Sequence, residues 1–285
     1  MTSAISGPAV STLVVGPAEE LESVLPGQPT SHVDRVESAA DAILSLAAKA
    51  YDLVVVDHTA PGDVTEEQLV YMRALRALRP GAKTILLVSH STTRKVIEAL
   101  RHGMFAYFSR PLDLPAVRDA IAQALSIRKW SDGIEVLSAA PDFITVRMRC
   151  SLPTADRLAQ FMKELPCALN GDERCELSMA FREMLLNAIE HGGKLDPNEW
   201  VLVSRVRTRR AIVYHIQDPG NGFSREDLCH AAISNPEDNP AAHLEVRMAE
   251  NMRPGGFGML IASQSVDEVI YSQTGNEVIL IKHLD

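Results

Sequence analysis

The stretch REMLLNAIEHGG, residues 182–193, carries several side chains that can bind or react. At 100° per residue, a helix over this stretch gathers two carboxylates, an amide and an imidazole on one side. These residues are Glu183, Asn187, Glu190 and His191. The opposite side is apolar and consists of Met184, Leu185, Ala188 and Ile189. The helix therefore has a core face and a chemical face, although polar residues opposite an apolar stripe often only meet water.

Two glycine-containing segments follow. QDPGNGF (217–223) comes directly after a predicted strand. Its Asp218 can accept a hydrogen bond from an exocyclic amine, and Gly220 and Gly222 permit close approach of the backbone to a ligand. A tight turn would explain this segment equally well. RPGGFGMLIA (253–262) places Gly255, Gly256 and Gly258 ahead of a predicted helix, whose free N–H groups and dipole favour a phosphate.

The order of these three segments carries more information than any one of them. ExxxN on a helix, DxGxG after a strand and GGFGM before a helix resemble the N, G1 and G2 boxes of the GHKL (Bergerat) ATP-binding fold. From about Phe143 onward, the sequence resembles the anti-sigma-factor serine kinases of bacterial partner-switching systems. The resemblance implies an α+β sandwich that binds ATP with Mg²⁺.

The resemblance also implies roles for single residues. Asn187 corresponds to the Mg²⁺ ligand, Glu183 to the general base and Asp218 to the carboxylate that reads the adenine amino group. The remaining nucleotide-binding positions are Gly220 and Gly222 of the first glycine box and Gly256 and Gly258 of the phosphate loop. The segment from Phe223 to about Pro254 corresponds to an ATP lid, with Arg225, Arg247 and Arg253 as candidate phosphate contacts. Glu190 and His191 are expected to support the site or the helix end.

The first part of the chain alternates apolar strands with helical patterns. The predicted strands are 12–16, 52–57 and 84–89, and the predicted helices are about 38–50, 65–78, 92–102 and 114–127. This alternation indicates an α/β domain with a flavodoxin-like parallel sheet covered by helices on both faces. Reactive groups of such sheets lie at the carboxyl ends of strands, where Asp57, Ser89 and Arg110 fall.

This segment resembles the receiver domain of response regulators. Asp57 matches the phosphoacceptor and Pro61 the proline four residues later. Ser89 and Tyr107 match the switch residues, and Arg110 stands where the family has Lys.

The receiver chemistry is incomplete. Gly16 and Pro17 occupy the positions of the two acids that hold Mg²⁺ in receivers, and Glu19 and Glu20 come too late, at the expected start of the first helix. An arginine fork is also a poor substitute for the lysine. We therefore expect a degenerate receiver, with Asp57 as its candidate phosphoacceptor.

Residues 128–142 break the periodicity and contain Gly133 and Pro141. The predicted organisation is a tail at 1–10, a receiver-like domain at 11–127, a linker at 128–142 and a GHKL domain at 143–285. The last of these should hold a strand at FITVRMRC, helices at about 153–165 and 172–191, a hairpin across TRR, a short helix after Gly258 and two final strands. Helices grouped on one face of an antiparallel sheet make an α+β sandwich.

Composition narrows the class of protein. The chain of 285 residues has 28 basic and 37 acidic residues, a net charge of -9 that offers no general attraction to nucleic acid or anionic membranes. The four cysteines are irregularly spaced and predict neither a zinc site nor a disulfide framework. No leader or membrane-length apolar run is evident, so we expect a cytoplasmic protein.

Two functions follow from these expectations. The first is a serine/threonine kinase that phosphorylates an anti-sigma-factor antagonist or a related partner, with a sigma factor as a further partner. The second is an ATP-binding module that sequesters its partner without phosphotransfer. A sensor histidine kinase is not favoured because it needs a phosphoacceptor His ahead of the ATP fold, and none falls between the receiver-like segment and Phe143. A chaperone or mismatch-repair ATPase would need further domains. The sequence leaves a homodimer open.

Overall fold

The computed structural model describes residues 10–25, 31–58, 66–127, 130–223, 231–236, 239–249 and 256–284. Among the positions with predicted roles, Pro61, Arg225, Arg253 and Gly255 lie outside these ranges. The chain divides into two compact units, which are residues 1–132 with 164–166 and residues 133–163 with 167–285.

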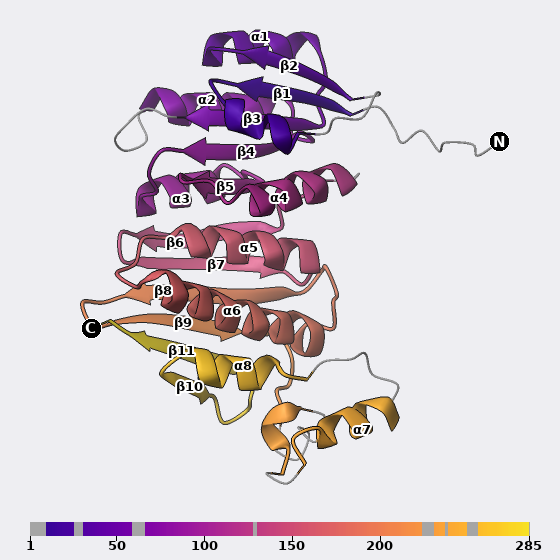
Figure 1. The fold of residues 1–285 in the computed structure, drawn as a ribbon, viewed down its shortest axis with the longest axis vertical. Helices are drawn as coiled ribbons and strands as arrows, with labels where there is room; N and C mark the ends of the chain where they lie inside the picture. The colour runs from indigo at the N-terminus through magenta and orange to yellow at the C-terminus, as the bar shows by residue number, and fades with distance from the viewer. Residues whose placement is uncertain are drawn as a thin grey trace, which may run out of the picture. The chain divides into compact units, whose positions relative to one another are not determined.

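The N-terminal unit alternates strands and helices (Figure 1). Its strands are β1 (Ser11–Val15), β2 (His32–Val36), β3 (Leu53–His58), β4 (Lys83–Val88) and β5 (Ala106–Ser109). Its helices are the 3₁₀ turn η1 (Glu19–Ser23), α1 (Ala39–Ala48), α2 (Glu66–Leu78), α3 (Thr93–Arg101) and α4 (Leu114–Ser126). The described strands pair in parallel in the order β2-β1-β3-β4-β5. This is the strand order of flavodoxin-like and receiver folds, so the predicted fold class is confirmed.

Central strands and helix caps explain why these residues adopt this fold. Leu13, Val55 and Leu87 are fully buried in β1, β3 and β4, as expected for strands that are covered on both faces. The helices α1, α3 and α4 begin where a side chain accepts a hydrogen bond from an N–H of the first turn. The capping residues are Ser38, Thr92 and Asp113.

One N-terminal element was not anticipated, and another is shorter than expected. Strand β2 has the sequence HVDRV, whose polar residues suit its position at the sheet edge but hide its strand character. Where receivers have their first helix, the described residues form the short turn η1, with Glu19 and Glu20 inside it. Pro17 and Pro26 bracket this turn, and a proline disfavours helical backbone at the residue before it.

The C-terminal unit is an antiparallel sheet with helices on one face (Figure 1). Its strands are β6 (Ile134–Ala140), β7 (Phe143–Arg149), β8 (Trp200–Arg207), β9 (Ala211–Gln217), β10 (Glu268–Tyr271) and β11 (Glu277–His283). Its helices are α5 (Leu152–Glu164), α6 (Gly171–Asn187) with the π-helical turn η2 (Ala188–Gly192), the 3₁₀ turn η4 (Ala232–Ser234), α7 (Ala242–Ala249) and α8 (Gly258–Ser265). The described strands follow the order β10-β11-β9-β8-β7-β6. Buried and less buried residues alternate along β7, β8 and β9, so one face of the sheet packs beneath α5, α6 and α8. The predicted α+β fold is confirmed.

Part of the predicted linker belongs to this sheet. Residues 134–140, expected between the domains, form strand β6, which pairs with β7 from Ile134↔Met148 to Ala140↔Phe143. The pairing shifts register between Val136 and Ser138. Such an irregularity breaks the alternation by which a strand is recognised in a sequence.

Within the described ranges, no helix combines the length and the apolar character that a membrane span requires.

Candidate functional site

Helix α6 presents the polar stripe of the opening motif. A capping box fixes its start, because Asn170 accepts the N–H of Glu173 while the Glu173 side chain accepts the N–H of Asn170. The predicted core face is confirmed, since all four of its residues are buried; they are Met184, Leu185, Ala188 and Ile189. The helix continues as the π-helical turn η2, a feature that is frequent at functional sites.

A cavity of about 400 Å³ lies against this stripe. Its lining includes Glu183, Asn187, Asp218, Gly256 and Gly258, which come from stretches far apart in the sequence. A volume of this size is within the range of cofactor and small-molecule sites. Five of the seven predicted C-terminal site residues therefore border one cavity.

Gly258 holds the start of α8 against the polar stripe. A Cβ atom at this position would lie 2.9 Å from Glu183 Oε2 and 3.5 Å from Asn187 Nδ2, so the backbone of Gly258 lies close to both side chains. The N-cap residue Phe257 makes no side-chain cap, and the first N–H groups of a helix have no acceptor within the helix itself. The carboxylate and the amide thus face a helix end that favours anions.

Asp218 follows β9 on another side of the cavity. Its Oδ1 accepts the N–H of Gly220 at 2.8 Å, and its own N–H donates to the carbonyl of Asn276 at 3.0 Å. Burial raises the pKa of the Asp218 carboxyl, an effect that the Gly220 N–H opposes. Gly192, at the end of η2, packs so closely on this carboxyl group that a Cβ atom there would overlap it. The π-helical turn therefore helps to fix Asp218.

The two glycines of the predicted first glycine box have packing roles. Gly220 lies against Gly192, and a Cβ atom on Gly220 would be 2.9 Å from the Cα atom of Gly192. Gly222 has a φ of 79° and packs on the carbonyl of Thr274, where a Cβ atom would overlap the carbonyl oxygen. Both residues bring the chain after β9 close to its neighbours.

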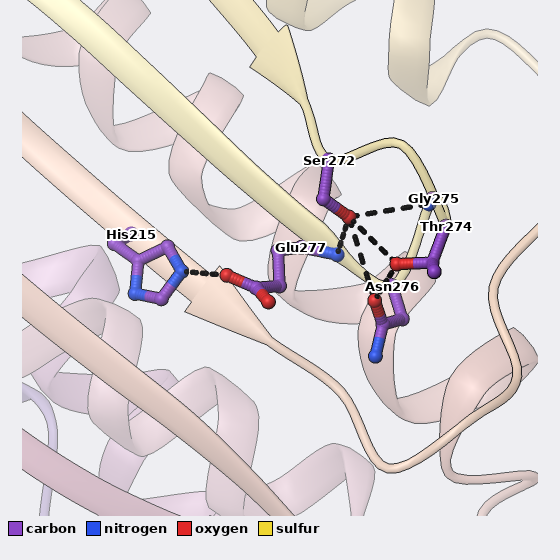
Figure 2. A network of polar contacts seen from close by, with 6 residues as sticks. All are labelled: His215, Ser272, Thr274, Gly275, Asn276 and Glu277. Carbon is purple, nitrogen blue, oxygen red and sulfur yellow. Dashed lines mark hydrogen bonds and ion pairs between the residues drawn. The ribbon is translucent and has the colours of Figure 1, made fainter.

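The turn between β10 and β11 borders the cavity and was not expected there from the sequence. Figure 2 shows Ser272 at the centre of its polar network, where Ser272 Oγ accepts the N–H groups of Gly275 and Glu277, each at 3.2 Å. Glu277 is also paired with His215 at 2.8 Å. Gly275, Asn276 and Glu277 line the cavity. The segment SQTGNE carries a turn signal, but nothing in it announces contact with Asp218.

An aromatic pair forms an apolar part of the lining. Tyr271 and Phe223 meet edge to face, with ring centroids 5.5 Å apart, and both line the cavity. The Tyr271 hydroxyl contacts Met184 Sδ at 3.5 Å, and burial raises the pKa of Tyr271 to about 12. This wall is suited to a flat apolar surface.

Three further predicted residues lie at the cavity. Glu190 and His191 line it from η2, and His191 is exposed. Arg247 of α7 lines it as well and is only 7% exposed. Among the described residues of the predicted lid, Arg247 is thus the arginine that lines the cavity.

In the N-terminal unit, Asp57 is held by Arg110. Arg110 Nη1 and Nη2 donate to Asp57 Oδ1 and Oδ2, each at 2.9 Å, and Glu20 lies 3.5 Å from Arg110 Nε. This contact with Asp57 raises the pKa of Arg110.

The end of β1 has no room for the acid that receivers carry there. Gly16 has a φ of 89°, and a Cβ atom on it would be 2.6 Å from the Asp57 carbonyl oxygen. Ser89 directly follows β4, and the Tyr107 hydroxyl contacts Ser91 Oγ at 3.2 Å.

Comparisons with known proteins agree with the two folds. A family model described as a histidine kinase-like ATPase domain matches residues 148–282. The transcriptional regulatory protein ZraR of Salmonella typhimurium is 25% identical over 103 residues, which are 36% of this chain and 22% of ZraR. The chain thus spans about a fifth of the length of this curated relative.

Solved receiver structures are also similar to this chain. A CheY-like receiver domain from Methanospirillum hungatei is 18% identical, with 41% of this chain and 94% of that chain covered and a TM-score of 0.36. A signal receiver domain from Pseudomonas fluorescens is 21% identical, with 44% and 93% covered and a TM-score of 0.37.

The family match includes helix α6, Asp218 and helix α8, which all border the cavity described above. Residues 148–282 match the histidine kinase-like ATPase domain family, and the N-terminal unit has a receiver-like fold.

Proposed function

We propose that this chain is a cytoplasmic signalling protein whose C-terminal domain uses Mg²⁺-ATP to phosphorylate a serine or threonine of a small protein partner. The ATPase domain implies ATP binding. The finer proposal, an anti-sigma-factor type of kinase regulated by its receiver-like domain, rests on the arrangement of the residues around the cavity.

Asp218 and the aromatic pair suit the adenine end of the nucleotide. A carboxylate oxygen is an acceptor for an exocyclic amino group, and Asp218 is fixed from two sides by Gly192 and Asn276. Phe223 and Tyr271 supply the apolar surface that a purine ring needs. In this pose Asp218 selects adenine by its hydrogen-bonding pattern.

The start of α8 suits the phosphate end. Gly256 and Gly258 line the cavity and would allow the backbone to approach a phosphate, and the N-terminus of a helix such as α8 favours an anion. Mg²⁺ usually takes one or two protein oxygen ligands and completes its shell with phosphates and water, so the amide oxygen of Asn187 fits as its protein ligand. The metal would neutralise phosphate charge during transfer.

The observation that carries the proposal is the approach of Gly258 to both Glu183 and Asn187. This approach brings the Glu183 carboxylate close to the point where the proposed phosphate loop meets helix α8. Glu183 would take the proton that the partner's hydroxyl loses as its oxygen bonds to the γ-phosphorus, with ADP as the leaving group. Arg182 Nη1 lies 3.7 Å from Glu183 Oε1, and Nη2 of the same arginine donates to Asp156 Oδ1.

The partner we propose is an anti-sigma-factor antagonist-like domain, with a sigma factor as a second ligand of the same kinase and a homodimer as its assembly. A net charge of -9 disfavours nucleic acid as a direct ligand.

A pull-down from the native cytoplasm with and without ATP, followed by phosphosite mapping of the retained proteins, tests the proposal. A retained partner that carries phosphoserine or phosphothreonine only when the bait is wild type, and not Glu183→Gln, supports the kinase. A partner retained in an ATP-dependent way without any phosphorylation would favour the module that sequesters without transfer.

A further inference from the structure

A second cavity, of about 270 Å³, lies in the N-terminal unit and is distinct from the ATP cavity. It opens between the sheet and the helices α2 and α3, beside the carboxyl ends of β1, β3 and β4. Its volume exceeds the roughly 150 Å³ that suffices for a benzene molecule in an engineered apolar cavity. A compact organic ligand would therefore fit.

Tyr71 gives this cavity an unsatisfied polar group. Its side chain belongs to α2 and lines the cavity, and the residue is only 8% exposed. Its hydroxyl is buried and has no hydrogen-bond partner among the described residues. Buried hydroxyls are nearly always paired in folded proteins, so this one is available for a ligand atom.

Lys95 gives the cavity a buried positive charge. The residue lies in the first turn of α3, is 2% exposed and donates from Nζ to the carbonyl of His90 at 3.1 Å. Within the described ranges, no carboxylate forms an ion pair with it, and the nearby Asp57 carboxylate is paired with Arg110. An ammonium group has three donors, and its burial without a counter-ion is unfavourable. An anionic ligand would therefore stabilise the buried ammonium group of Lys95.

His58 and Glu37, two neighbouring polar residues, do not offset the positive charge of Lys95. Burial, and then Lys95 itself, lower the pKa of His58, which disfavours a second cation beside Lys95. Glu37 also lines the cavity, but it is exposed, where water screens its charge.

Asp57, whose carboxylate is paired with Arg110, also lines the cavity, and the remaining walls are apolar. Met72 and Leu75 come from α2, Val88 from β4 and Met104 from the segment before β5. These residues are buried, and methionine side chains adapt to ligands of different outline.

We propose that this cavity binds a small carboxylate with a compact apolar body. The ligand's carboxylate would accept hydrogen bonds from Lys95 Nζ and the Tyr71 hydroxyl, and its apolar part would contact Met72 and Met104. The receiver-like domain would then respond to a metabolite of this class at a place next to Asp57.

The test uses the full chain with ¹³C-labelled methionine methyl groups. Benzoate is titrated as the anionic probe and benzyl alcohol as a neutral probe of similar size, while the methyl resonances of Met72 and Met104 are followed. Assignment uses the single variants Met72→Leu and Met104→Leu. We expect saturable shifts of both resonances with benzoate and affinity for benzyl alcohol weaker by about tenfold or more, since a hydrogen bond to a charged group is lost.

Three variants connect the binding to the proposed residues. Lys95→Met, which keeps the shape of the side chain, should weaken benzoate by about tenfold or more, and Tyr71→Phe by about threefold to tenfold. Lys49→Met is the control, because Lys49 is paired with Asp34 away from the cavity and should leave the affinity unchanged. Equal affinity of benzoate for wild type and Lys95→Met would overturn the proposal. So would equal binding of the two probes, or no saturable shift, in the wild-type chain, a comparison that requires no variant to fold.

Discussion

Arg110 binds both carboxylate oxygens of Asp57 through its two terminal nitrogens, each at 2.9 Å. The Asp57 side chain is fully buried and the Arg110 side chain is 21% exposed. A parallel pair of charge-assisted hydrogen bonds is among the stronger polar contacts in proteins. The residue that replaces the receiver lysine thus occupies the carboxylate that would have to attack a phosphodonor.

We predict little or no stable phosphorylation of Asp57 by acetyl phosphate in the presence of Mg²⁺. Both oxygens of its carboxylate are engaged, and Gly16 leaves no room for a metal-binding acid beside it. Intact-mass measurement after incubation checks this expectation. A near-stoichiometric phosphate adduct that disappears in Asp57→Ala would contradict it.

Arg110→Ala should destabilise the N-terminal domain by on the order of 3 kcal/mol, because it leaves the buried Asp57 carboxylate without a partner. Urea unfolding followed by Trp130 fluorescence in a Trp200→Phe background measures this, since Trp130 packs against Phe105 in the same domain. Arg101→Ala is the control.

The control removes the more exposed i,i+3 pair with Glu98 and should cost less than about 1 kcal/mol. Similar losses for both variants would show that the Arg110 pair contributes no more than a surface contact. The double variant Arg110→Ala with Asp57→Ala should recover part of the loss.

Patterns of local sequence predicted much of the fold. The continuous apolar runs in β3 and β4 and the helix patterns of α1 to α4 fall within two residues of the expected ranges. Strand β2 escaped because edge strands tolerate polar residues, and β6 because its register shift disrupts the alternation. Both elements are held by partners distant in sequence.

The sequence named some of the residues that line the candidate site, but not the geometry of the site. The N, G1 and G2 motifs predicted roles for Asn187, Asp218 and Gly258. The contact of Gly192 with Asp218, however, depends on a π-helical turn that the spacing of apolar residues in the sequence does not predict. The pairing of Arg110 with Asp57 likewise joins residues from two strand ends that only the folded sheet brings together.

Asp218→Asn should weaken ATP binding and stabilise the ligand-free C-terminal domain. The amide presents a donor where the adenine amino group needs an acceptor, and it removes a buried charge. Because burial raises the pKa of Asp218 in the folded state, the cost of its charge is complete above that pKa and fades as the pH falls toward the ordinary value of 3.8.

Binding of a fluorescent ATP analogue and thermal unfolding between pH 4 and 8 measure both effects of Asp218→Asn. The difference in stability between mutant and wild type should be largest at neutral pH and shrink on acidification. Equal ATP affinities would remove Asp218 from the site.

Glu183→Gln should leave ATP affinity nearly intact and reduce phosphotransfer to the cognate partner by about 10²–10⁴-fold, the usual contribution of a general base. Asn187→Ala should weaken both steps, because it removes the proposed metal ligand. ATP titration and single-turnover transfer assays on the two variants separate these roles. Transfer at the wild-type rate in Glu183→Gln would disprove the assignment of the base.

Gly192→Ala should weaken ATP binding by about tenfold or more, because its methyl group would displace the carboxyl group of Asp218 and with it a directed hydrogen bond. Gly171→Ala is the matched control, since a Cβ atom there meets no atom within 4 Å. The same fluorescent-nucleotide titration compares the two variants. Equal effects would mean that the contact with Asp218 is not required for binding.

Strand β6 decides where the ATPase domain can be cut from the rest of the chain. A fragment that starts at residue 143 would strip β6 from β7 and expose a row of unpaired N–H and C=O groups on β7. Such an exposed edge invites pairing with another copy, so the fragment would gain a route to self-association through β7 that β6 blocks in the whole chain. Residues 134–140 are therefore part of the smallest unit in which nucleotide binding can be measured on its own.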